Sequence, residues 1–353
     1  MSTKKHCRPD QPTRREFLKQ AIGGIAGLAL FPKDLPAFFS TSKSNLTNLS
    51  KGRVLKESVM LFSEPKFTAW PVGRVGMNSV VKLLESVPGE PDPFGDSDWY
   101  HISSHLYVHA SGIQPVEELV NPVQLQVSPY GQLAKVTVPF TKAWKAPFAR
   151  MKEFINLFYG SNHWVTGVAQ AEDGKYYYKI EEDRWQENYF VPAECLHLFS
   201  TEDLKPISPD VPAEAKRLEV DLKQQQVTAF ENEKAVFHSK ISSGYRNSNK
   251  DYSTPPGEYR ITLKRPSRHM THSDRLNDAD SELYGVPWMC NFTETGIALH
   301  GTYWHNEFTH PRSHGCINLP IEAARWIYLW CEPPVPAGEM KYVTREGTAV
   351  FVH

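Results

Sequence analysis

Short runs in which apolar and polar residues alternate recur along this chain, and prolines and glycines separate them. Examples are VLKESVMLF (54–62), SVVKLLESV (79–87) and RLEVDL (217–222). A strand points successive side chains to opposite faces, so these runs predict half-buried β-strands joined by turns. In the C-terminal part only PIEAARWIYLWC (320–331) has a helical pattern, with Pro320 expected at the first helical position, where proline is favoured. The pattern predicts a mainly β protein with one or two short helices.

The length and two linker-like stretches indicate several domains. A chain of 353 residues exceeds what one ordinary domain needs. A Ser/Thr/Asn-rich stretch lies near residues 40–50, and the proline-rich segment KPISPDVPAEAK (205–216) has the composition of a hinge. We therefore expect four regions: an N-terminal leader and linker at 1–50, two small β domains at 53–118 and 130–200, and a C-terminal domain at 214–353.

The N-terminus has the pattern of an export signal. Arg14 and Arg15 precede the apolar run AIGGIAGLALF (21–31), which is rich in glycine and alanine. This run is shorter than the about 20 apolar residues of a membrane-spanning helix, and with the arginine pair it resembles a twin-arginine signal. The resemblance implies the twin-arginine export machinery as a partner and a location in the cell envelope, periplasm or cell wall. Membrane attachment would then occur only through an uncleaved leader. An ordinary amphipathic N-terminal helix is the alternative.

Charge and cysteine content restrict the partners. Lys and Arg number 39 and Asp and Glu 40, a formal net charge of -1, so no general positive field attracts nucleic acid or an anionic membrane. We expect no nucleic-acid partner. The five cysteines have no regular spacing that indicates a disulfide framework, and a Cys290–Cys331 bridge stays open.

One cysteine and several histidines crowd into residues 300–316. A structural zinc site needs four ligands in closely spaced pairs, and this segment offers a single cysteine, Cys316, so we expect neither a metal nor another cofactor. In an extended segment His314 and Cys316 point to the same side, and Gly315 between them leaves room for close approach. A nearby imidazolium lowers the pKa of a thiol, and a histidine can transfer its proton. The residues favour a cysteine nucleophile, with a zinc protein or an inert buried cysteine as alternatives.

Several ordered motifs resemble one enzyme family. HGT (300–302) followed by SHGCIN (313–318) is similar to the catalytic motif of the L,D-transpeptidases: a histidine, a spacer, then S/T-H-G-C-hydrophobic-R/N. TPPGEY (254–259) resembles the family's T-P-x-G-x-F/Y turn, and residues 220–244 and 347–353 resemble its first hairpin and last strand. The resemblance covers about residues 216–353. It implies a mainly β-sandwich enzyme that acts on peptidoglycan stem peptides.

The resemblance also implies catalytic roles. Cys316 would attack a tetrapeptide stem and hold it as a thioester, and His300 would be the general base, oriented by the backbone of Gly301. His314 and the backbone amides of Gly315 and Cys316 would stabilise the oxyanion. An amine acceptor would produce a cross-link or exchange the terminal D-residue, and water would make the enzyme an L,D-carboxypeptidase; the sequence does not separate these acceptors.

Other residues are candidates for substrate binding or for the spacer. Those expected to contact substrate or to line the acyl-binding cleft are Asn318, Ser313, Trp304, Tyr284 and Trp288. His305 and His310 belong to the variable spacer and are expected to be exposed. The polar segment 264–283 falls where the family carries a lid, and its charges, including Arg265 and Arg268, are expected either to meet a zwitterionic substrate end or to be solvated.

Two N-terminal segments share one ending, an aromatic-x-Ile strand followed by V-x-A-x-x-[IL]. In this alignment Val108, Ala110 and Ile113 match Val191, Ala193 and Leu196. The ending resembles that of a bacterial Src-homology-3-like barrel, which implies two small β-barrels, the second with an irregular insert at 148–164. Such barrels bind peptides or wall polymers or serve as spacers. A non-catalytic wall-binding protein is thus a further alternative.

Overall fold

The computed structural model describes residues 51–147, 154–271, 282–336 and 338–353. The chain divides into two units, Met1–Ala37 and Phe38–His353, and all described residues belong to the second. The predicted twin-arginine signal and its linker lie outside the described residues. In the described part of the chain, no helix is long and apolar enough to cross a membrane.

The first β region forms two small antiparallel sheets, ordered β4-β1-β8 and β3-β2-β7-β6-β5. The run 79–87 contributes one strand to each sheet, and Leu83 between them is fully buried with Val54, Val108 and Ile113. The expected strands are therefore present, although this run is divided. The elements are β1 (Lys51–Val54), β2 (Ser58–Phe62), β3 (Pro71–Gly76), β4 (Val80–Lys82), β5 (Glu85–Pro88), β6 (Asp98–Ser103), β7 (Leu106–His109), η1 (Ala110–Gly112) and β8 (Ile113–Val116).

The second β region is one antiparallel sheet ordered β11-β10-β14-β13-β12-β9-β15. The expectation of an irregular insert at 148–164 is wrong for its described part, because residues 154–158 form β11 and pair along the whole length of β10. The Src-homology-3-like assignment of both regions stays a prediction. The elements are β9 (Gln132–Val136), β10 (Phe140–Trp144), β11 (Phe154–Phe158), β12 (Asn162–Gln170), β13 (Tyr176–Glu181), β14 (Asn188–Pro192), η2 (Ala193–Cys195) and β15 (Leu196–Leu198).

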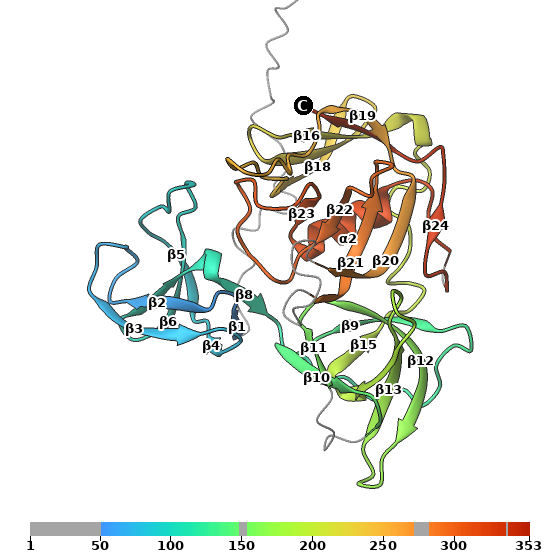
Figure 1. Ribbon diagram of the computed structural model, residues 1–353, viewed down its shortest axis with the longest axis horizontal. Helices are drawn as coiled ribbons and strands as arrows, with labels where there is room; N and C mark the ends of the chain where they lie inside the picture. The colour runs from blue at the N-terminus through green and yellow to red at the C-terminus, as the bar shows by residue number, and fades with distance from the viewer. Residues whose placement is uncertain (1–50, 148–153, 272–281, 337) are drawn as a thin grey trace, which may run out of the picture. The chain divides into compact units, whose positions relative to one another are not determined.

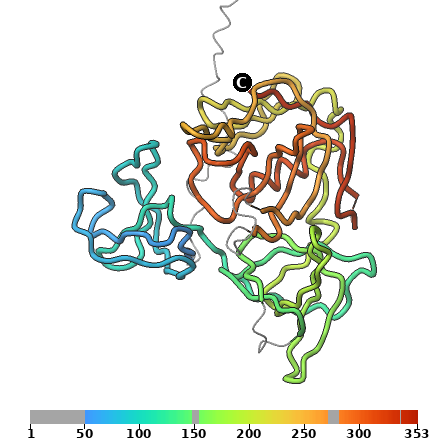
Figure 2. Tube along the Cα trace, viewed as in Figure 1, coloured from blue at the N-terminus to red at the C-terminus, as the bar shows by residue number. Residues whose placement is uncertain are grey.

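The C-terminal region contains two five-stranded sheets, ordered β18-β17-β16-β25-β19 and β23-β22-β21-β20-β24 (Figure 1). Its last strand returns to pair in parallel with its first, β25 beside β16 (Figure 2). The elements are η3 (Ala213–Ala215), β16 (Lys216–Asp221), β17 (Gln226–Glu231), β18 (Lys234–Lys240), β19 (Gly257–Arg260), β20 (Leu263–Thr271), β21 (Glu282–Asn291), β22 (Ala298–Gly301), β23 (Ile317–Leu319), α2 (Ile321–Trp330), β24 (Tyr342–Val343) and β25 (Ala349–Val352).

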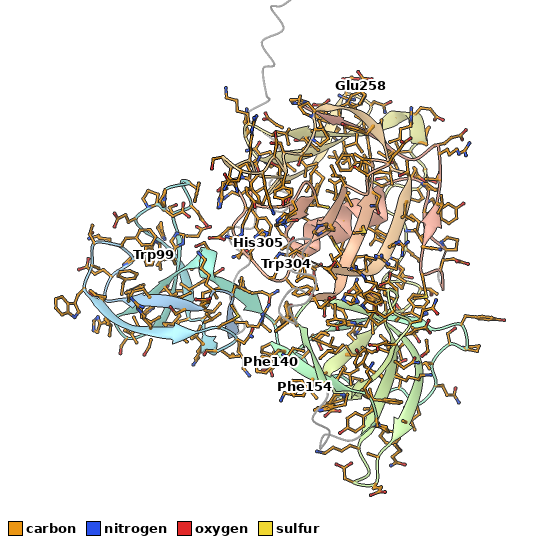
Figure 3. All side chains as sticks on the ribbon, in the orientation of Figure 1. Trp99, Phe140, Phe154, Glu258, Trp304 and His305 are labelled. Atoms are coloured by element: carbon orange, nitrogen blue, oxygen red, sulfur yellow. The ribbon has the colours of Figure 1, made fainter. Side chains whose placement is uncertain are left out.

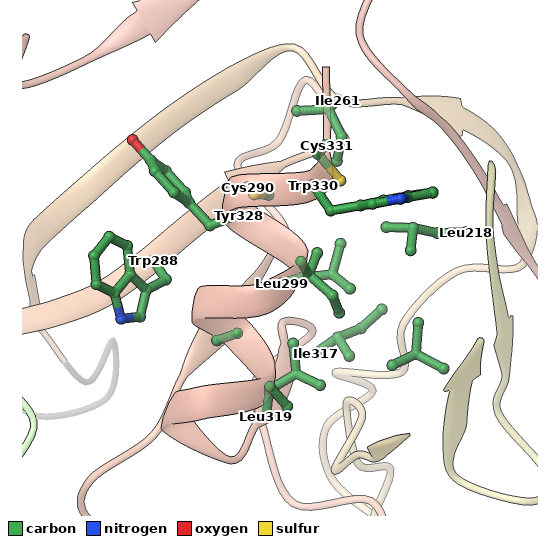
Figure 4. Packing of buried hydrophobic residues seen from close by; sticks show 14 of the residues in the cluster. Leu218, Ile261, Trp288, Cys290, Leu299, Ile317, Leu319, Tyr328, Trp330 and Cys331 are labelled. Atoms are coloured by element: carbon green, nitrogen blue, oxygen red, sulfur yellow. The ribbon is translucent and has the colours of Figure 1, made fainter. Parts of the chain in front are cut away.

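Helix α2 supplies much of the core of this region. Pro320 is the N-cap, so the helix begins at Ile321, one residue after the predicted start. Trp330 at its end packs near Leu218 of β16, and Leu299, Ile317 and Leu319 fill the adjoining space (Figure 4). Burying apolar faces of both sheets against one helix explains why alternating strands and one helical pattern suffice for this fold. The mainly β fold is confirmed.

Cys290 and Cys331 lie together in this core as buried free thiols, so the disulfide that the sequence left open is not formed. The two thiols share a hydrogen bond beside the ammonium group of Lys264. Burial raises the pKa of the Cys290 thiol, whereas the hydrogen bond from Cys290 and the Lys264 charge lower the pKa of Cys331 despite its burial.

Candidate active site

Parallel pairing of β22 with β23 brings the two ends of the histidine–cysteine motif together. Leu299 lies opposite Ile317, and both point into the core. His300 lies opposite Asn318, and because strand side chains alternate, both point away from that core. Cys316 comes directly before β23, and its thiol is hydrogen-bonded to the backbone of Ala298, two residues before His300. The histidine and the cysteine therefore share one side of the strand pair.

The imidazole of His300 is held in one orientation by its own chain. The side chain is only 1% exposed, and Nδ1 lies 3.1 Å from the carbonyl oxygen of Gly301. A carbonyl only accepts, so the ring proton lies on Nδ1 and Nε2 is free to accept a proton. Burial lowers the pKa of His300 to about 4, which keeps the ring neutral at physiological pH. The imidazole is therefore neutral and oriented by the Gly301 carbonyl, and the catalytic roles of both residues stay predictions.

The thiol of Cys316 is protonated in the resting site. Cys316 is half-buried, and burial raises the pKa of its thiol; the hydrogen bond to the Ala298 backbone offsets part of that effect. With His300 neutral, the site holds a protonated thiol and a neutral imidazole rather than a thiolate and an imidazolium. Proton removal by Nε2 during attack is the activation that such a pair allows.

A tight turn, not an extended segment, carries the cysteine. Gly315 has φ of 116°, a conformation that side chains other than glycine rarely adopt. The expectation that His314 and Cys316 share a face as strand residues is therefore wrong, since β23 begins only at Ile317. Ser313, expected to bind substrate, is 7% exposed, and its Oγ accepts from the Gly315 N–H at 3.1 Å. Ser313 thus shapes the turn.

Thr254 of the TPPGEY motif anchors this turn from outside. Its side chain is 1% exposed; Oγ1 donates to the carbonyl of Gly315 at 2.8 Å and accepts from the Gly244 N–H at 2.9 Å. A side chain at position 244 would collide with the backbone, since its Cβ would lie 2.8 Å from the Cα of Gly315. The motif therefore fixes the nucleophile turn, a role that its sequence pattern did not reveal.

His314 lies against two aromatic rings. Its ring centroid is 4.5 Å from that of Tyr252 and 5.5 Å from that of Tyr245, both in edge-to-face arrangements. The side chain is half-buried at the surface of the site. The motif spacing did not predict that these tyrosines contact His314, because they lie in the segment between β18 and β19, far from the motif in sequence.

His305 is buried, so the expectation that it is an exposed spacer residue is wrong. It is 5% exposed, its Nε2 lies 2.8 Å from the side-chain amide of Asn318, and its Nδ1 accepts from the Glu307 N–H at 3.2 Å. Burial lowers the pKa of His305 well below its usual range. Asn318 itself is 4% exposed with its amide turned to His305, a geometry that does not support direct substrate contact. His310 is half-buried and stacks on Phe94 at 3.6 Å.

Of the three aromatic cleft candidates, only Trp304 lies beside His300, the predicted base. Its half-buried ring is 5.8 Å from the ring of His300 and lies next to His305 (Figure 3). Tyr284 stacks on His269 and lines a pocket with His163 and Glu182. Trp288 is 1% exposed in the core beside Tyr328, so its assignment to the cleft is wrong.

The described part of segment 264–283 is a β-hairpin arm, not a loop. β20 and β21 are antiparallel, with Leu263 opposite Asn291 at one end and Thr271 opposite Glu282 at the other. Arg265 and Arg268 both reach Asp183, which follows β13, at 3.2 and 2.6 Å. Their charges are thus paired within the chain, which does not support their expected use on substrate.

The histidines around Cys316 form no metal site in the described part of the chain. Among the residues that the structure describes, no group of three or more His, Cys, Asp or Glu side chains is arranged to hold a metal ion. His300, His305 and His314 contact a carbonyl, an amide and two phenol rings respectively.

Comparisons with known proteins follow the same division of the chain. Residues 215–352 match the family model described as the YkuD L,D-transpeptidase catalytic domain. No curated protein sequence matches this chain.

Among solved structures, three L,D-transpeptidases are similar to parts of the chain. A cysteine-to-serine mutant from Enterococcus faecium has 22% identity over 39% of this chain and 50% of that one, with a TM-score of 0.31. L,D-transpeptidase 3 from Mycobacterium tuberculosis has 18% identity over 52% and 81%, with a TM-score of 0.31. The enzyme from Mycobacterium smegmatis has 17% identity over 53% and 98%, with a TM-score of 0.31. The match covers 50% of the Enterococcus faecium chain, so this protein spans about half the length of that relative.

Proposed function

Residues 215–352 are a catalytic domain of the L,D-transpeptidase (YkuD) family, and from this premise we propose that the chain is a cysteine acyltransferase acting on peptidoglycan stem peptides. The observation that carries the proposal is the His300–Cys316 arrangement. The Cys316 thiol is hydrogen-bonded to the backbone of Ala298 on β22, and the neutral imidazole of His300, two residues after Ala298, is oriented by the Gly301 carbonyl. A nucleophile, a base and a third group that orients the base are the parts that covalent catalysis needs.

In the first half-reaction Cys316 Sγ attacks the carbonyl that joins the L-centre of a tetrapeptide stem to its terminal D-residue. His300 Nε2 takes the thiol proton as the C–S bond forms, and the tetrahedral intermediate then expels the amine. The imidazolium returns the proton to that amine, so the terminal D-residue leaves and a thioester remains on Cys316. A neutral His300 in the resting state suits this sequence, since the ring must first accept a proton.

In the second half-reaction an amine from a neighbouring stem, or a free D-amino acid, attacks the thioester. His300 takes the proton of that amine and passes it to the departing Cys316 sulfur, which restores the resting site. Water in place of the amine would make the enzyme an L,D-carboxypeptidase. Both acceptors use the same residues, so the products decide between them.

Negative charge on the carbonyl oxygen needs donors near the turn. The backbone N–H of Cys316 and the His314 side chain are our candidates, together with Gly315. The Gly315 N–H is engaged with Ser313 Oγ at 3.1 Å in the resting structure, so it would have to be shared with the oxyanion. Trp304 beside His300 would line the acyl-binding side of the site.

The remaining parts of the proposal concern location. The twin-arginine pattern at Arg14 and Arg15 supports export of the folded protein to the cell envelope, where peptidoglycan lies. Two Src-homology-3-like barrels would accompany the catalytic domain, a prediction supported by the repeated sequence ending and by the small β sheets of residues 51–198.

Covalent capture by a carbapenem tests the nucleophile. We expect one adduct per chain by intact mass on the wild type and on Cys195→Ala, a matched cysteine variant in the second β region, and none on Cys316→Ala. Folded wild type that acquires no adduct would count against the proposal. About one tightly held zinc per chain, lost in Cys316→Ala, would replace it with the zinc-protein alternative.

Incubation with a disaccharide-tetrapeptide tests the acceptor. Cross-linked dimers would identify a transpeptidase, and tripeptides without dimers would identify an L,D-carboxypeptidase. An unchanged substrate with a folded enzyme would favour a non-catalytic wall-binding protein.

A further inference from the structure

Arg53 is a buried arginine in the first β region, and its guanidinium reaches the C-terminal region. It is 3% exposed on β1. Within its own region, Nε and Nη2 donate to Gln114 Oε1 at 3.0 and 2.8 Å, and Nη1 donates to Asn78 Oδ1 at 2.9 Å. Nη2 also donates to the backbone carbonyl of Tyr303 at 2.5 Å, across 250 positions of sequence.

The second β region completes the surroundings of this guanidinium. Its central carbon lies 4.4 Å from the ring centroid of Phe158, and the same ring stacks on Tyr303 at 5.8 Å. The backbone carbonyl of Tyr159 accepts from the Gln114 amide at 3.1 Å. Arg53 is therefore in contact with residues of all three β regions.

The acceptors around Arg53 are all neutral, namely two side-chain amides and one carbonyl. Burial consequently lowers the pKa of Arg53 to about 10, at which the group is still charged at neutral pH. A buried cation without an anion is costly unless its donors are satisfied and an aromatic face lies nearby, and the planar fork of arginine suits such a multi-partner site. A shorter or neutral side chain would not make the same set of contacts.

Tyr303 is the third residue after the catalytic base. The Thr302 N–H before it donates to the Leu319 carbonyl at 3.0 Å, which ties this stretch to β23. The hydroxyl of Tyr303 donates to the Tyr284 carbonyl at 2.8 Å. Trp304 after it packs on the His300 ring at 5.8 Å. The hydrogen bond from Arg53 to the Tyr303 carbonyl therefore holds the chain directly after Gly301. The carbonyl of Gly301 in turn orients His300.

Two more contacts hold the same spacer to the first β region. The Asn306 side chain donates to the carbonyls of Ala110 and Ile113 at 3.2 and 3.1 Å. Lys56 Nζ pairs with Glu307 Oε1 at 2.7 Å. With the stacking of His310 on Phe94, the spacer between His300 and Cys316 thus contacts residues 51–116 at four positions, Tyr303, Asn306, Glu307 and His310.

We infer that Arg53 is a positioning residue for the catalytic base: it acts through the Tyr303 carbonyl, and it makes the first β region part of the catalytic unit rather than a tethered accessory. The inference rests on the proposed function of His300 and Cys316. Displacement of a catalytic group by about 1 Å costs on the order of 100-fold in rate, so loss of this contact is expected to be visible in kinetics.

The test compares full-length variants in the rate of Cys316 acylation by a carbapenem. Arg53→Gln is expected to slow acylation about 10- to 100-fold. Arg53→Lys, which keeps a charge and a donor for Tyr303, is expected to recover most of the rate. Arg74→Gln, an exposed arginine on β3 of the same region, is the matched control and should react like the wild type. Wild-type rates in folded Arg53→Gln would overturn the inference.

A second readout separates positioning from overall stability and from the proposed function. The rate at which iodoacetamide alkylates Cys316, followed on its peptide by mass across pH, reports how readily the thiol loses its proton. Arg53→Gln should shift that profile to higher pH, and Arg53→Lys should restore it; an unchanged profile would contradict the inference. If the carbapenem does not label the wild type, the proposed function fails and this profile alone decides the role of Arg53.

Asn306→Ala covers the case in which Arg53→Gln does not fold. This variant removes the hydrogen bonds of the half-buried Asn306 side chain to the first β region and leaves the contacts of Arg53 intact. We expect acylation several-fold slower than in the wild type, with an unchanged melting temperature of the first β region. An unaltered acylation rate in this variant would contradict the part of the inference that makes the first β region part of the catalytic unit.

Discussion

The side-chain amide of Asn318 lies 2.8 Å from Nε2 of His305, with both residues no more than 5% exposed. This contact joins strand β23, which begins directly after Cys316, to the spacer between His300 and Cys316. Water cannot readily replace a partner lost at such a buried position, so each of the two side chains depends on the other. The spacer is thus part of the packed site, not a solvated connection.

Replacing His305 by alanine should destabilise the fold. The variant leaves the buried amide of Asn318 without its partner, which costs roughly 1–3 kcal/mol in the free energy of unfolding. Urea denaturation measures the loss. His310→Ala is the matched control, since it removes a half-buried ring stacked on Phe94, and we expect a smaller change. Equal losses in the two variants would show that the Asn318 contact has no special weight.

Removing the base should abolish rapid acylation but not the fold. His300→Ala is expected to slow adduct formation on Cys316 by about 100- to 10,000-fold, the usual contribution of general acid–base catalysis. Time-resolved intact mass after carbapenem addition measures the rate, and circular dichroism checks the fold. Comparable rates for variant and wild type would remove His300 from the mechanism.

Stability should fall as the pH drops from about 7 to 4. Burial lowers the pKa of His300 to about 4 and that of His163 to about 3, whereas a histidine in the unfolded chain titrates near 6.5. In this window the unfolded chain binds more protons than the native one, so the free energy of unfolding rises with pH and falls on acidification. For His300 alone the effect is at most roughly 3 kcal/mol.

Urea titrations at several pH values between 4 and 7 measure this dependence. His300→Gln should have a shallower slope than the wild type, because glutamine does not titrate. An identical slope in the two proteins would mean that the native and unfolded chains protonate His300 alike.

The hydroxyl of Thr254 should matter for both stability and reactivity. Thr254→Val keeps the shape of the side chain but leaves the Gly315 carbonyl and the Gly244 N–H without a partner, at a cost of roughly 1–3 kcal/mol. The turn that carries Cys316 would loosen, and carbapenem acylation should slow. Thr228→Val on β17, where the hydroxyl makes one 3.3 Å contact with His238, is the control and should change little. A rate loss in the control alone would contradict the assignment.

Local patterns predict much of this protein because they record local geometry. Alternation of apolar and polar residues marks which strand face is buried, and the structure places Leu299 and Ile317 in the core while His300 points away. The helix begins at Ile321, within one residue of the start that its pattern predicts. The ordered motifs in residues 216–353 indicate the family, which the match at residues 215–352 confirms.

The errors concern residues whose surroundings come from distant parts of the chain. Trp288 was expected in the cleft, but it packs on Phe199 of the preceding region at 5.4 Å. Arg265 and Arg268 were expected to be available for substrate or solvated, but Asp183 pairs with both. Nothing in the sequence near these residues indicates their partners, because burial and ion pairing at these sites depend on how the β regions pack.

By itself the sequence determined the type of fold and the family motif of histidine and cysteine, since strand periodicity and motif spacing depend on neighbours along the chain. Only the tertiary structure decided that the resting pair is neutral, that His305 supports Asn318, and that Arg53 reaches Tyr303. These properties arise from desolvation and from hydrogen bonds between segments far apart in sequence, and such contacts exist only once the chain has folded.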